Sequence, residues 1–273
     1  MFRVLERQLI PQALQNLERP RKESGWDGFF LWDHLVEWNK PIPIYETFAS
    51  LSAIAASTSR IRIGTSVSPL PKYKPWITAR KTVALDQLSN GRLTLGVGIG
   101  AKESTDYDRF GETSENHVLG EKLDESLQII TRLADWQIVQ LSRKTFHDQA
   151  SRLPAYSSSE TSYSNLDWRI LASQGPLQES GEMGWHGSSP SARRACSPRG
   201  YKKTTTYVRN HRTGKSGFDV ANIGFTTGVN PTRDREKIMR FSEAGMTWWL
   251  ESMWTKRDKP QEMRTRIMKG PPA

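Results

Sequence analysis

Residues 24–100 contain three short strand-like runs, separated by stretches with helical periodicity. The runs predict buried strands over 28–32, 61–67 and 93–100. Between them, 44–58 and 76–88 have the apolar spacing of helices that pack on a sheet. Strands that alternate with helices predict an α/β fold with a parallel sheet and right-handed crossovers.

The pattern continues beyond position 100 with one long interruption. It predicts a helix over 117–133, a strand over 220–225, a helix over 234–244 and a strand over 246–250. Residues 134–200 are instead rich in Ser, Arg and Gln without a sustained period, which is typical of a linker or of disorder. No first strand is evident in residues 1–22. We predict one domain over 1–273 with an irregular segment over 134–200 inside it.

Composition narrows the class of protein. A hydrophobic content of 36% is lean for a parallel α/β barrel, whose strands are normally near-continuous apolar runs. The sequence shows no signal peptide and no apolar run of about 18 residues, so a soluble, cytoplasmic protein without a membrane partner is expected. The single Cys196 excludes an internal disulfide and a cysteine-cluster metal site, and the histidines have no metal-binding spacing.

The formal net charge of +10 raises the question of an acidic partner. Most of the excess lies in 201–273, where the cations are spread along helix-like segments and are not interleaved with aromatic residues. This distribution favours a solvated basic face over a nucleic-acid-binding surface. A basic nucleic-acid-binding protein with an α/β core remains the weaker alternative.

Candidate chemistry lies where two predicted strands end, which is the edge at which α/β folds place their active sites. The first strand ends in Asp33 and His34, and an imidazole can exchange protons near neutral pH. The third carries Gly96, Gly98 and Gly100, which would let a planar ring approach the backbone closely. The structural alternatives are a histidine that caps the strand and bonds to Asp33, and glycines that allow tight strand–helix packing.

Three stretches resemble the bacterial-luciferase-like family of flavin-dependent oxidoreductases. They are Ser24-Gly-Trp-Asp-Gly-Phe-Phe-Leu-Trp-Asp-His34, Leu88-Ser-Asn-Gly-Arg-Leu-Thr-Leu-Gly-Val-Gly-Ile-Gly100, and the tail Met246-Thr-Trp-Trp-Leu-Glu251 with 269–273. The resemblance covers about 24–133 and 207–273. It implies a (β/α)8 TIM barrel that binds FMN or coenzyme F420 at its carboxyl face. It also implies hydride transfer or monooxygenation of a small organic substrate, and it suggests a homodimer.

The resemblance assigns roles to individual residues. It implies that His34 and Asp33 are catalytic, and that 64–66 form a backbone bulge, often with a non-prolyl cis peptide, that supports the flavin ring. The residues interpreted as cofactor-binding are Trp32, Gly64, Thr65, Ser66, Gly98 and Gly100. Ala101 stands where many F420-dependent relatives have Glu. This departure weakens the F420 interpretation, and the choice between FMN and F420 stays open.

A frameshift would explain the irregular middle of the chain. Codons chosen for 162–187 and read with the first base dropped permit a buried strand, a glycine pair and an amphipathic helix that resemble the family. A shift spanning about 134–200 would remove the fifth and sixth strands and leave an incomplete barrel that binds flavin poorly, so a catalytically inactive remnant is the second interpretation. Resequencing codons 125–210 tests the hypothesis. A new read without the compensating single-base indels would restore the family sequence, whereas an unchanged read would favour the remnant.

Overall fold

The computed structural model describes residues 2–3, 25–35, 45–100, 107–134, 172–173, 220–253 and 260–272, together with Pro198, Lys202 and Thr206. Most of the segment 134–200, and with it most of the predicted irregular region, therefore lies outside the described residues. Ala101 lies outside them as well.

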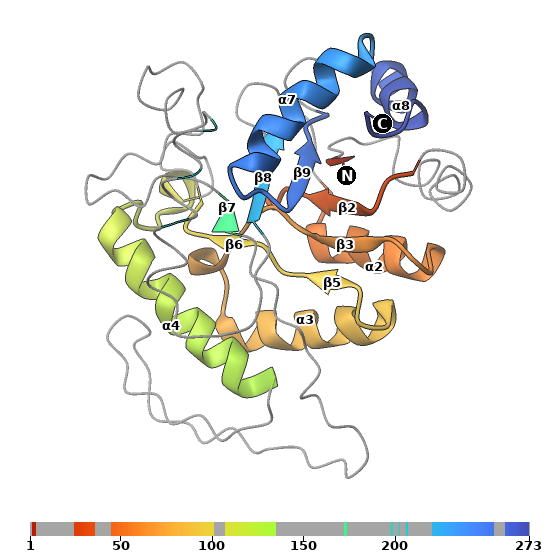
Figure 1. Cartoon of the computed structure of the whole chain (residues 1–273). Helices are drawn as coiled ribbons and strands as arrows, with labels where there is room; N and C mark the ends of the chain where they lie inside the picture. The colour runs from red at the N-terminus through yellow and green to blue at the C-terminus, as the bar shows by residue number, and fades with distance from the viewer. Residues whose placement is uncertain are drawn as a thin grey trace, which may run out of the picture.

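A seven-stranded parallel sheet forms the centre of the molecule (Figure 1). Its strand order is β5-β3-β2-β1-β9-β8-β7. The strands are β1 (Phe2–Arg3), β2 (Gly28–Leu31), β3 (Arg62–Thr65), β5 (Leu93–Thr94), β7 (Ala172–Ser173), β8 (Val220–Gly224) and β9 (Trp248–Glu251). The order follows the chain from β2 to β5 and from β7 to β9, as expected for successive right-handed crossovers.

β1 joins the two halves of the sheet. Phe2 pairs with Phe29 of β2 on one side and with Glu251 of β9 on the other. The sequence analysis found no strand in 1–22, so that expectation was wrong. A two-residue strand gives too short an apolar run to be recognised by its period, and only its two neighbours in the sheet identify it.

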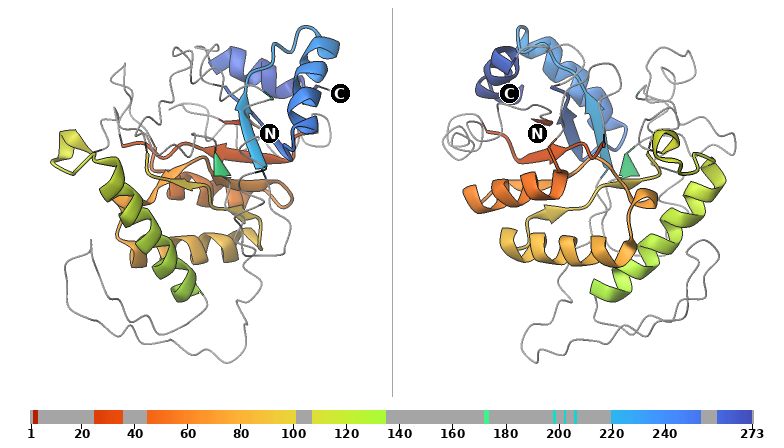
Figure 2. Two further views of the ribbon diagram at one scale, coloured as in Figure 1. Left: turned by 60° about the vertical axis from the view of Figure 1, so that its left-hand side comes forward. Right: turned by 180° about the vertical axis from the view of Figure 1, so that it is seen from behind.

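In the part of the chain that the structure describes, five α-helices flank the sheet, and the layers are visible in Figure 2. They are α2 (Thr47–Ser57), α3 (Pro75–Ser89), α4 (Asn116–Ala134), α7 (Pro231–Glu243) and α8 (Pro260–Met268), with short 3-10 helices η1 (Leu70–Lys72) and η2 (Asp108–Phe110). The four helices expected from periodicity are confirmed within a few residues of their ends. α8 was not predicted, because it is a short, charged helix with few apolar positions.

The third predicted strand is two separate strands. Leu93 and Thr94 pair with β3, whereas β6 (Val97–Gly98) leaves that ladder and pairs with β4 (Ser68–Pro69) in a second, two-stranded sheet. The carbonyl of Gly96 explains the change of partner. It accepts a hydrogen bond from Thr65 Oγ1 at 2.7 Å and another from Ser68 N at 2.7 Å, so the chain turns toward the segment after β3.

The ends of the seven-stranded sheet, β5 and β7, are not paired with each other among the described residues. The resemblance implied eight strands, and residues 135–171, which connect α4 to β7, are outside the described part. β7 itself lies within the irregular segment and pairs with β8 through Ala172 and Val220. The loss of the fifth and sixth strands was expected only if a frameshift spans this segment, and it stays a prediction.

Arg92 ties two helix ends to the sheet. Its guanidinium donates to the carbonyls of Ala55 at 2.9 Å and Thr58 at 2.8 Å, near the end of α2, and to Ser89 O at 2.6 Å, at the end of α3. The last carbonyls of a helix have no partner within the helix, so a cation at this place satisfies them and complements the helix dipole. The hydrophobic core lies between the helices and the sheet. Its buried side chains include Phe29, Leu51, Ile54, Ile63 and Leu85.

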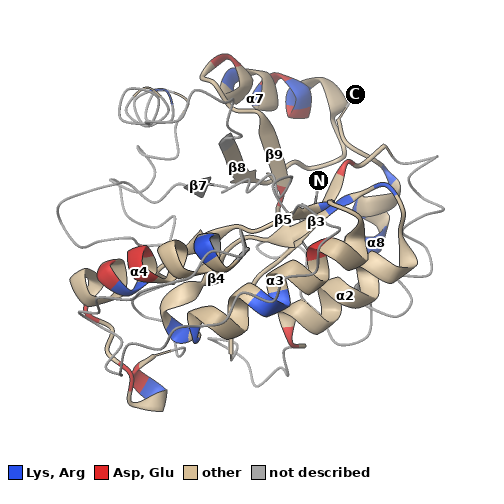
Figure 3. Cartoon of the chain, turned by 90° about the horizontal axis from the view of Figure 1, so that it is seen from below, with Lys and Arg blue, Asp and Glu red and all other residues tan. Residues whose placement is uncertain are grey.

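Charged side chains of both signs share the described helices. α4 and α7 each carry Lys or Arg together with Asp or Glu, as Figure 3 shows. Charges of both signs on α4 and α7 are typical of a solvated surface. Among the described residues, no helix has the length and apolar character needed to cross a membrane.

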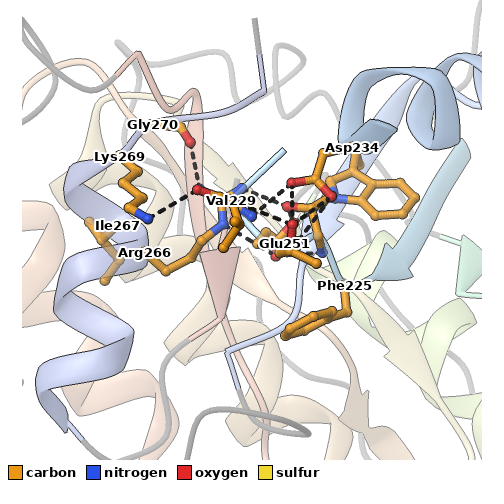
Figure 4. Close-up of polar contacts among 12 residues, drawn as sticks. Phe225, Val229, Asp234, Glu251, Arg266, Ile267, Lys269 and Gly270 are labelled. Atoms are coloured by element: carbon orange, nitrogen blue, oxygen red, sulfur yellow. Dashed lines mark hydrogen bonds and ion pairs between the residues drawn. The ribbon is translucent and has the colours of Figure 1, made fainter. Parts of the chain in front are cut away.

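The C-terminal helix α8 is held to the sheet by a buried ion pair. Glu251 at the end of β9 is fully buried, and its Oε1 lies 3.6 Å from Nε of Arg266 on α8. The carboxylate also accepts from Thr226 N, Thr226 Oγ1 and Trp249 Nε1, each at 2.9 Å (Figure 4). Arg266 in turn donates to Thr226 Oγ1 at 2.7 Å. The ion pair and these hydrogen bonds stabilise two buried charges, although Arg266 Nε itself has no hydrogen-bond partner among the described residues.

Gly64 permits the close approach of β3 to its neighbours. A Cβ atom at this position would lie 2.2 Å from the carbonyl oxygen of Thr94 and 2.7 Å from the Phe30 ring. The first of these atoms belongs to the backbone of β5, so the strand itself would have to shift. Gly64 is therefore required by the sheet, independently of any ligand.

Glu251→Gln is expected to lower the free energy of unfolding by about 3–5 kcal/mol, because it leaves the buried Arg266 guanidinium without its counter-ion. Urea unfolding followed by circular dichroism measures the change. Lys122→Gln is the control, since it removes a pair with Glu112, whose side chain is 57% exposed, and about 1 kcal/mol or less is expected. Equal effects of the two substitutions would contradict the role given to Glu251.

Gly64→Ala is expected to cost about 1–3 kcal/mol of stability, because the added methyl overlaps the Thr94 carbonyl. The matched control is Gly120→Ala in α4, where the new methyl meets nothing within 4 Å. Alanine has the higher helix propensity, so a gain of about 0.5–1 kcal/mol is expected there. The same urea titrations measure both, and a neutral Gly64→Ala would disprove the steric account.

Candidate active site

The carboxyl ends of β2 and β3 lie side by side. Leu31 and Thr65 are paired in the sheet, and Ser66 N donates to the carbonyl of Leu31 at 2.8 Å. The residues that follow, Trp32 to His34 on one strand and Ser66 to Ser68 on the other, therefore share one edge of the sheet. This is the edge at which parallel α/β folds place their chemistry.

Asp33 is the centre of this edge. The residue is only 4% exposed, and its carboxylate accepts hydrogen bonds from Ser68 Oγ and from Tyr73 OH, the latter at 2.6 Å. Lys72 Nζ lies 3.3 Å from Asp33 Oδ1 and also donates to the main-chain carbonyl of Asp33. That Asp33 is catalytic stays a prediction. These contacts show that its carboxylate joins the end of β2 to the segment after β3.

His34 is half-buried, and its ring meets the neighbouring tryptophan. The ring centroids of Trp32 and His34 are 5.7 Å apart with an interplanar angle of 88°, an edge-to-face arrangement. The carbonyl of Trp32 accepts from Thr47 Oγ1, at the start of α2, at 2.8 Å. The ring contact and this hydrogen bond both hold the residues that follow β2. Among these residues, His34 has a titratable side chain that solvent can partly reach.

Thr65 and Ser66 end β3 almost completely buried, with 0% and 1% exposure. The peptide bond between Ser66 and Val67 is cis, as the resemblance implied for this place. Thr65 uses its hydroxyl to hold the Gly96 carbonyl. Neither side chain is presented to solvent in this arrangement, so their contacts with a cofactor, like that of Gly64, stay predictions.

Gly98 and Gly100 are partly exposed, and protein atoms lie close to the position that a side chain would take at each. A Cβ on Gly98 would lie 3.1 Å from Val67 Cγ2, and one on Gly100 would lie 3.1 Å from both Pro69 Cβ and Tyr107 Cε2. Gly100 also has a φ of +84°, which disfavours other residues. Packing against β4 and Tyr107 thus explains these glycines without a ligand, and their predicted approach to a flavin is untested.

Sequence reasoning missed the polar residues that surround Asp33. Ser68, Lys72 and Tyr73 all come from the segment directly after the cis peptide. The prolines at 69 and 71 indicated only that a strand ends there. A Lys and a Tyr close to two prolines form no periodic pattern, so the sequence does not indicate what they bind. Their partner Asp33 is far away in sequence and becomes a neighbour only in the folded chain.

The loop after β8 lies at the same end of the sheet, and the amides of 226–228 donate hydrogen bonds to side chains of the chain itself. Thr226 N donates to Glu251, while Thr227 N and Gly228 N donate to Asp234 at 3.0 and 2.7 Å (Figure 4). Late loops of α/β barrels often offer such amides to a phosphate group. Here carboxylates of the chain itself occupy all three.

Comparison with known proteins places these features in a family. A family model described as luciferase-like monooxygenase matches residues 14–161, more than half of the chain. The 4-hydroxyprotoasukamycin monooxygenase of Streptomyces nodosus subsp. asukaensis is 34% identical over 121 residues, 42% of this chain and 32% of that protein. The F420-dependent glucose-6-phosphate dehydrogenase of Beutenbergia cavernae is 34% identical over 105 residues, 36% of this chain and 30% of that protein. The matches span about a third of the length of these relatives.

Solved structures extend the likeness to the whole chain. An F420-dependent secondary alcohol dehydrogenase superposes with a TM-score of 0.67 at 17% identity, over 98% of this chain and 96% of its own. The coenzyme F420-dependent tetrahydromethanopterin reductase of Methanopyrus kandleri does so with a TM-score of 0.67 at 13% identity, over 100% and 97%. At these identities the likeness shows the fold, which is the α/β barrel of the luciferase-like enzymes. With the match over 14–161, it follows that the chain belongs to the luciferase-like monooxygenase family.

Proposed function

We propose that this protein is an oxidoreductase that uses FMN or coenzyme F420 to transfer hydride to or from, or to monooxygenate, a small organic substrate. The observation that carries the proposal is His34, a half-buried imidazole at the carboxyl end of β2 in a luciferase-like barrel. The names of the similar proteins support both reaction types, since they include a monooxygenase and F420-dependent dehydrogenases.

The described residues fit the ring of such a carrier better than its phosphate. Trp32 and His34 provide an aromatic edge and a proton-exchanging group at one strand end. The amides of 226–228, a natural phosphate cradle in this fold, are taken by Glu251 and Asp234. Lys72, the cation at this edge, is held by Asp33. A phosphate would therefore be bound by other parts of the chain.

The chain itself contributes a positioned acid–base group, His34, which transfers a proton. Once bound, the carrier supplies the redox chemistry, which a protein side chain cannot supply. One imidazole nitrogen of His34 gives a proton to, or takes one from, the substrate group that changes oxidation state. The Trp32 ring packs edge-to-face against His34, and the Asp33 carboxylate, which accepts from Ser68 and Tyr73, fixes the strand end from which His34 extends. A cytoplasmic location and a homodimer belong to the same proposal, on the family resemblance.

A non-catalytic member of the family is the second candidate. It is favoured by the irregular sequence over 134–200, where a barrel of this family would need further strands. A barrel without those strands would lack part of the wall that encloses a ligand. The two candidates differ in one simple property, the binding of a flavin or deazaflavin.

Fluorescence titration of the purified protein with F420 and, separately, with FMN tests the proposal. Saturable binding of one of them is expected. If F420 binds, glucose-6-phosphate and a secondary alcohol are the first substrates to test, and a change in the absorbance of the bound F420 would report their oxidation.

His34→Gln is expected to lower turnover by about 10²–10⁴-fold while the carrier still binds. His117→Gln, on the exposed start of α4, is the control and should leave turnover unchanged. Absence of binding for both carriers would support the non-catalytic candidate.

A further inference from the structure

Lys72 is a buried cation that the proposed chemistry does not use. Its side chain is 4% exposed, as is that of Asp33, the carboxylate that it faces at 3.3 Å. A buried ammonium is stable only where a counter-charge and hydrogen bonds replace its water. Asp33 supplies both, through Oδ1 and through its main-chain carbonyl.

The bond to the carbonyl is the informative one. That carbonyl belongs to the peptide bond that joins Asp33 to His34, so a donor on it fixes the plane of this peptide. A Lys that served only to neutralise the Asp33 carboxylate would need no contact with the backbone. Lys72 therefore reaches past the side chain to the main chain from which His34 extends.

The remaining donors hold the carboxylate from other directions. Ser68 Oγ binds Oδ2, and Tyr73 OH binds Oδ1 at 2.6 Å. All three donors come from residues 68–73, the segment between the cis peptide and α3, which begins at Pro75. Two neighbouring strand ends are thereby locked together immediately before His34.

We propose that Lys72 is a positioning residue for His34, acting through the carbonyl and the carboxylate of Asp33. Its consequence for catalysis rests on the proposed function, whereas its effect on the orientation of His34 does not. Lys72 sets the peptide plane, Tyr73 and Ser68 keep the carboxylate in place, and the imidazole has one orientation relative to Trp32.

The first test observes His34 directly and needs no cofactor. Protein labelled with ¹³C-histidine gives one imidazole Cε1–Hε1 cross-peak per histidine, and the cross-peak that His34→Gln removes belongs to His34. Lys72→Met is expected to displace or split that cross-peak, and Lys72→Arg, which keeps the charge and several donors, is expected to return it toward its original position. Lys74→Met is the matched control, because Lys74 is exposed and its ammonium lies over the Trp76 ring, and it should leave the cross-peak unchanged.

A second variant covers the case in which Lys72→Met does not fold because Asp33 is left buried and uncompensated. The pair Asp33→Asn with Lys72→Met removes both charges together and still removes the donor to the carbonyl. It is expected to displace the His34 cross-peak as well. An unchanged cross-peak in the folded Lys72→Met protein, or in this double variant, would overturn the proposal.

The second test adds turnover with whichever carrier, F420 or FMN, the wild-type protein binds. Lys72→Met is expected to lower kcat roughly 10- to 100-fold, because a small misplacement of a reacting group is costly, with the Kd of the carrier unchanged. Equal loss of kcat and of carrier binding would indicate a merely structural role. If the wild-type protein binds neither carrier, the proposed function fails, and the His34 cross-peak still decides the role of Lys72.

Discussion

The buried carboxylate of Asp33 is the constraint around which the carboxyl edge is built. An ionised carboxylate out of water is stable only when several donors surround it, and the chain supplies Ser68, Lys72 and Tyr73 from one short segment. The segment after β3 must therefore fold over the end of β2. This arrangement places β4 where β6 can pair with it. It also brings the glycines of 96–100 to the carboxyl end of the sheet.

A second buried carboxylate organises the other half of the molecule in the same way. Glu251 gathers Thr226, Trp249 and Arg266, and so it joins β8, β9 and α8. The two halves meet at β1, which pairs with β2 on one side and β9 on the other. The luciferase-like fold of this chain thus rests on two polar centres joined by a very short strand. The same use of carboxylates occupies the amides of 226–228, which bears on where a cofactor phosphate can bind.

Periodicity was sufficient for the long elements and insufficient for the contacts that form the site. The helices at 47–57, 75–89, 116–134 and 231–243 have apolar spacing that depends on local sequence alone, so they could be predicted. β1, β7 and α8 could not, since they are too short or too polar to show a period and exist because of their partners. Trp32, Asp33 and His34 were placed correctly at a strand end. The role of Lys72 was invisible, because a buried lysine looks like a surface lysine until its acceptor is known.

A double-mutant cycle between Asp33→Asn and Tyr73→Phe measures the central constraint most directly, with the free energy of unfolding from urea titration as the readout. Both substitutions are nearly isosteric, and asparagine keeps an acceptor oxygen, so the cycle measures what the negative charge of the carboxylate adds to its hydrogen bond with the phenol. We expect a coupling of about 1 kcal/mol, the difference between a buried hydrogen bond to a charged group and one to a neutral group. A coupling near zero would mean that Tyr73 and Asp33 contribute independently, and would contradict the view that this carboxylate holds the two strand ends together.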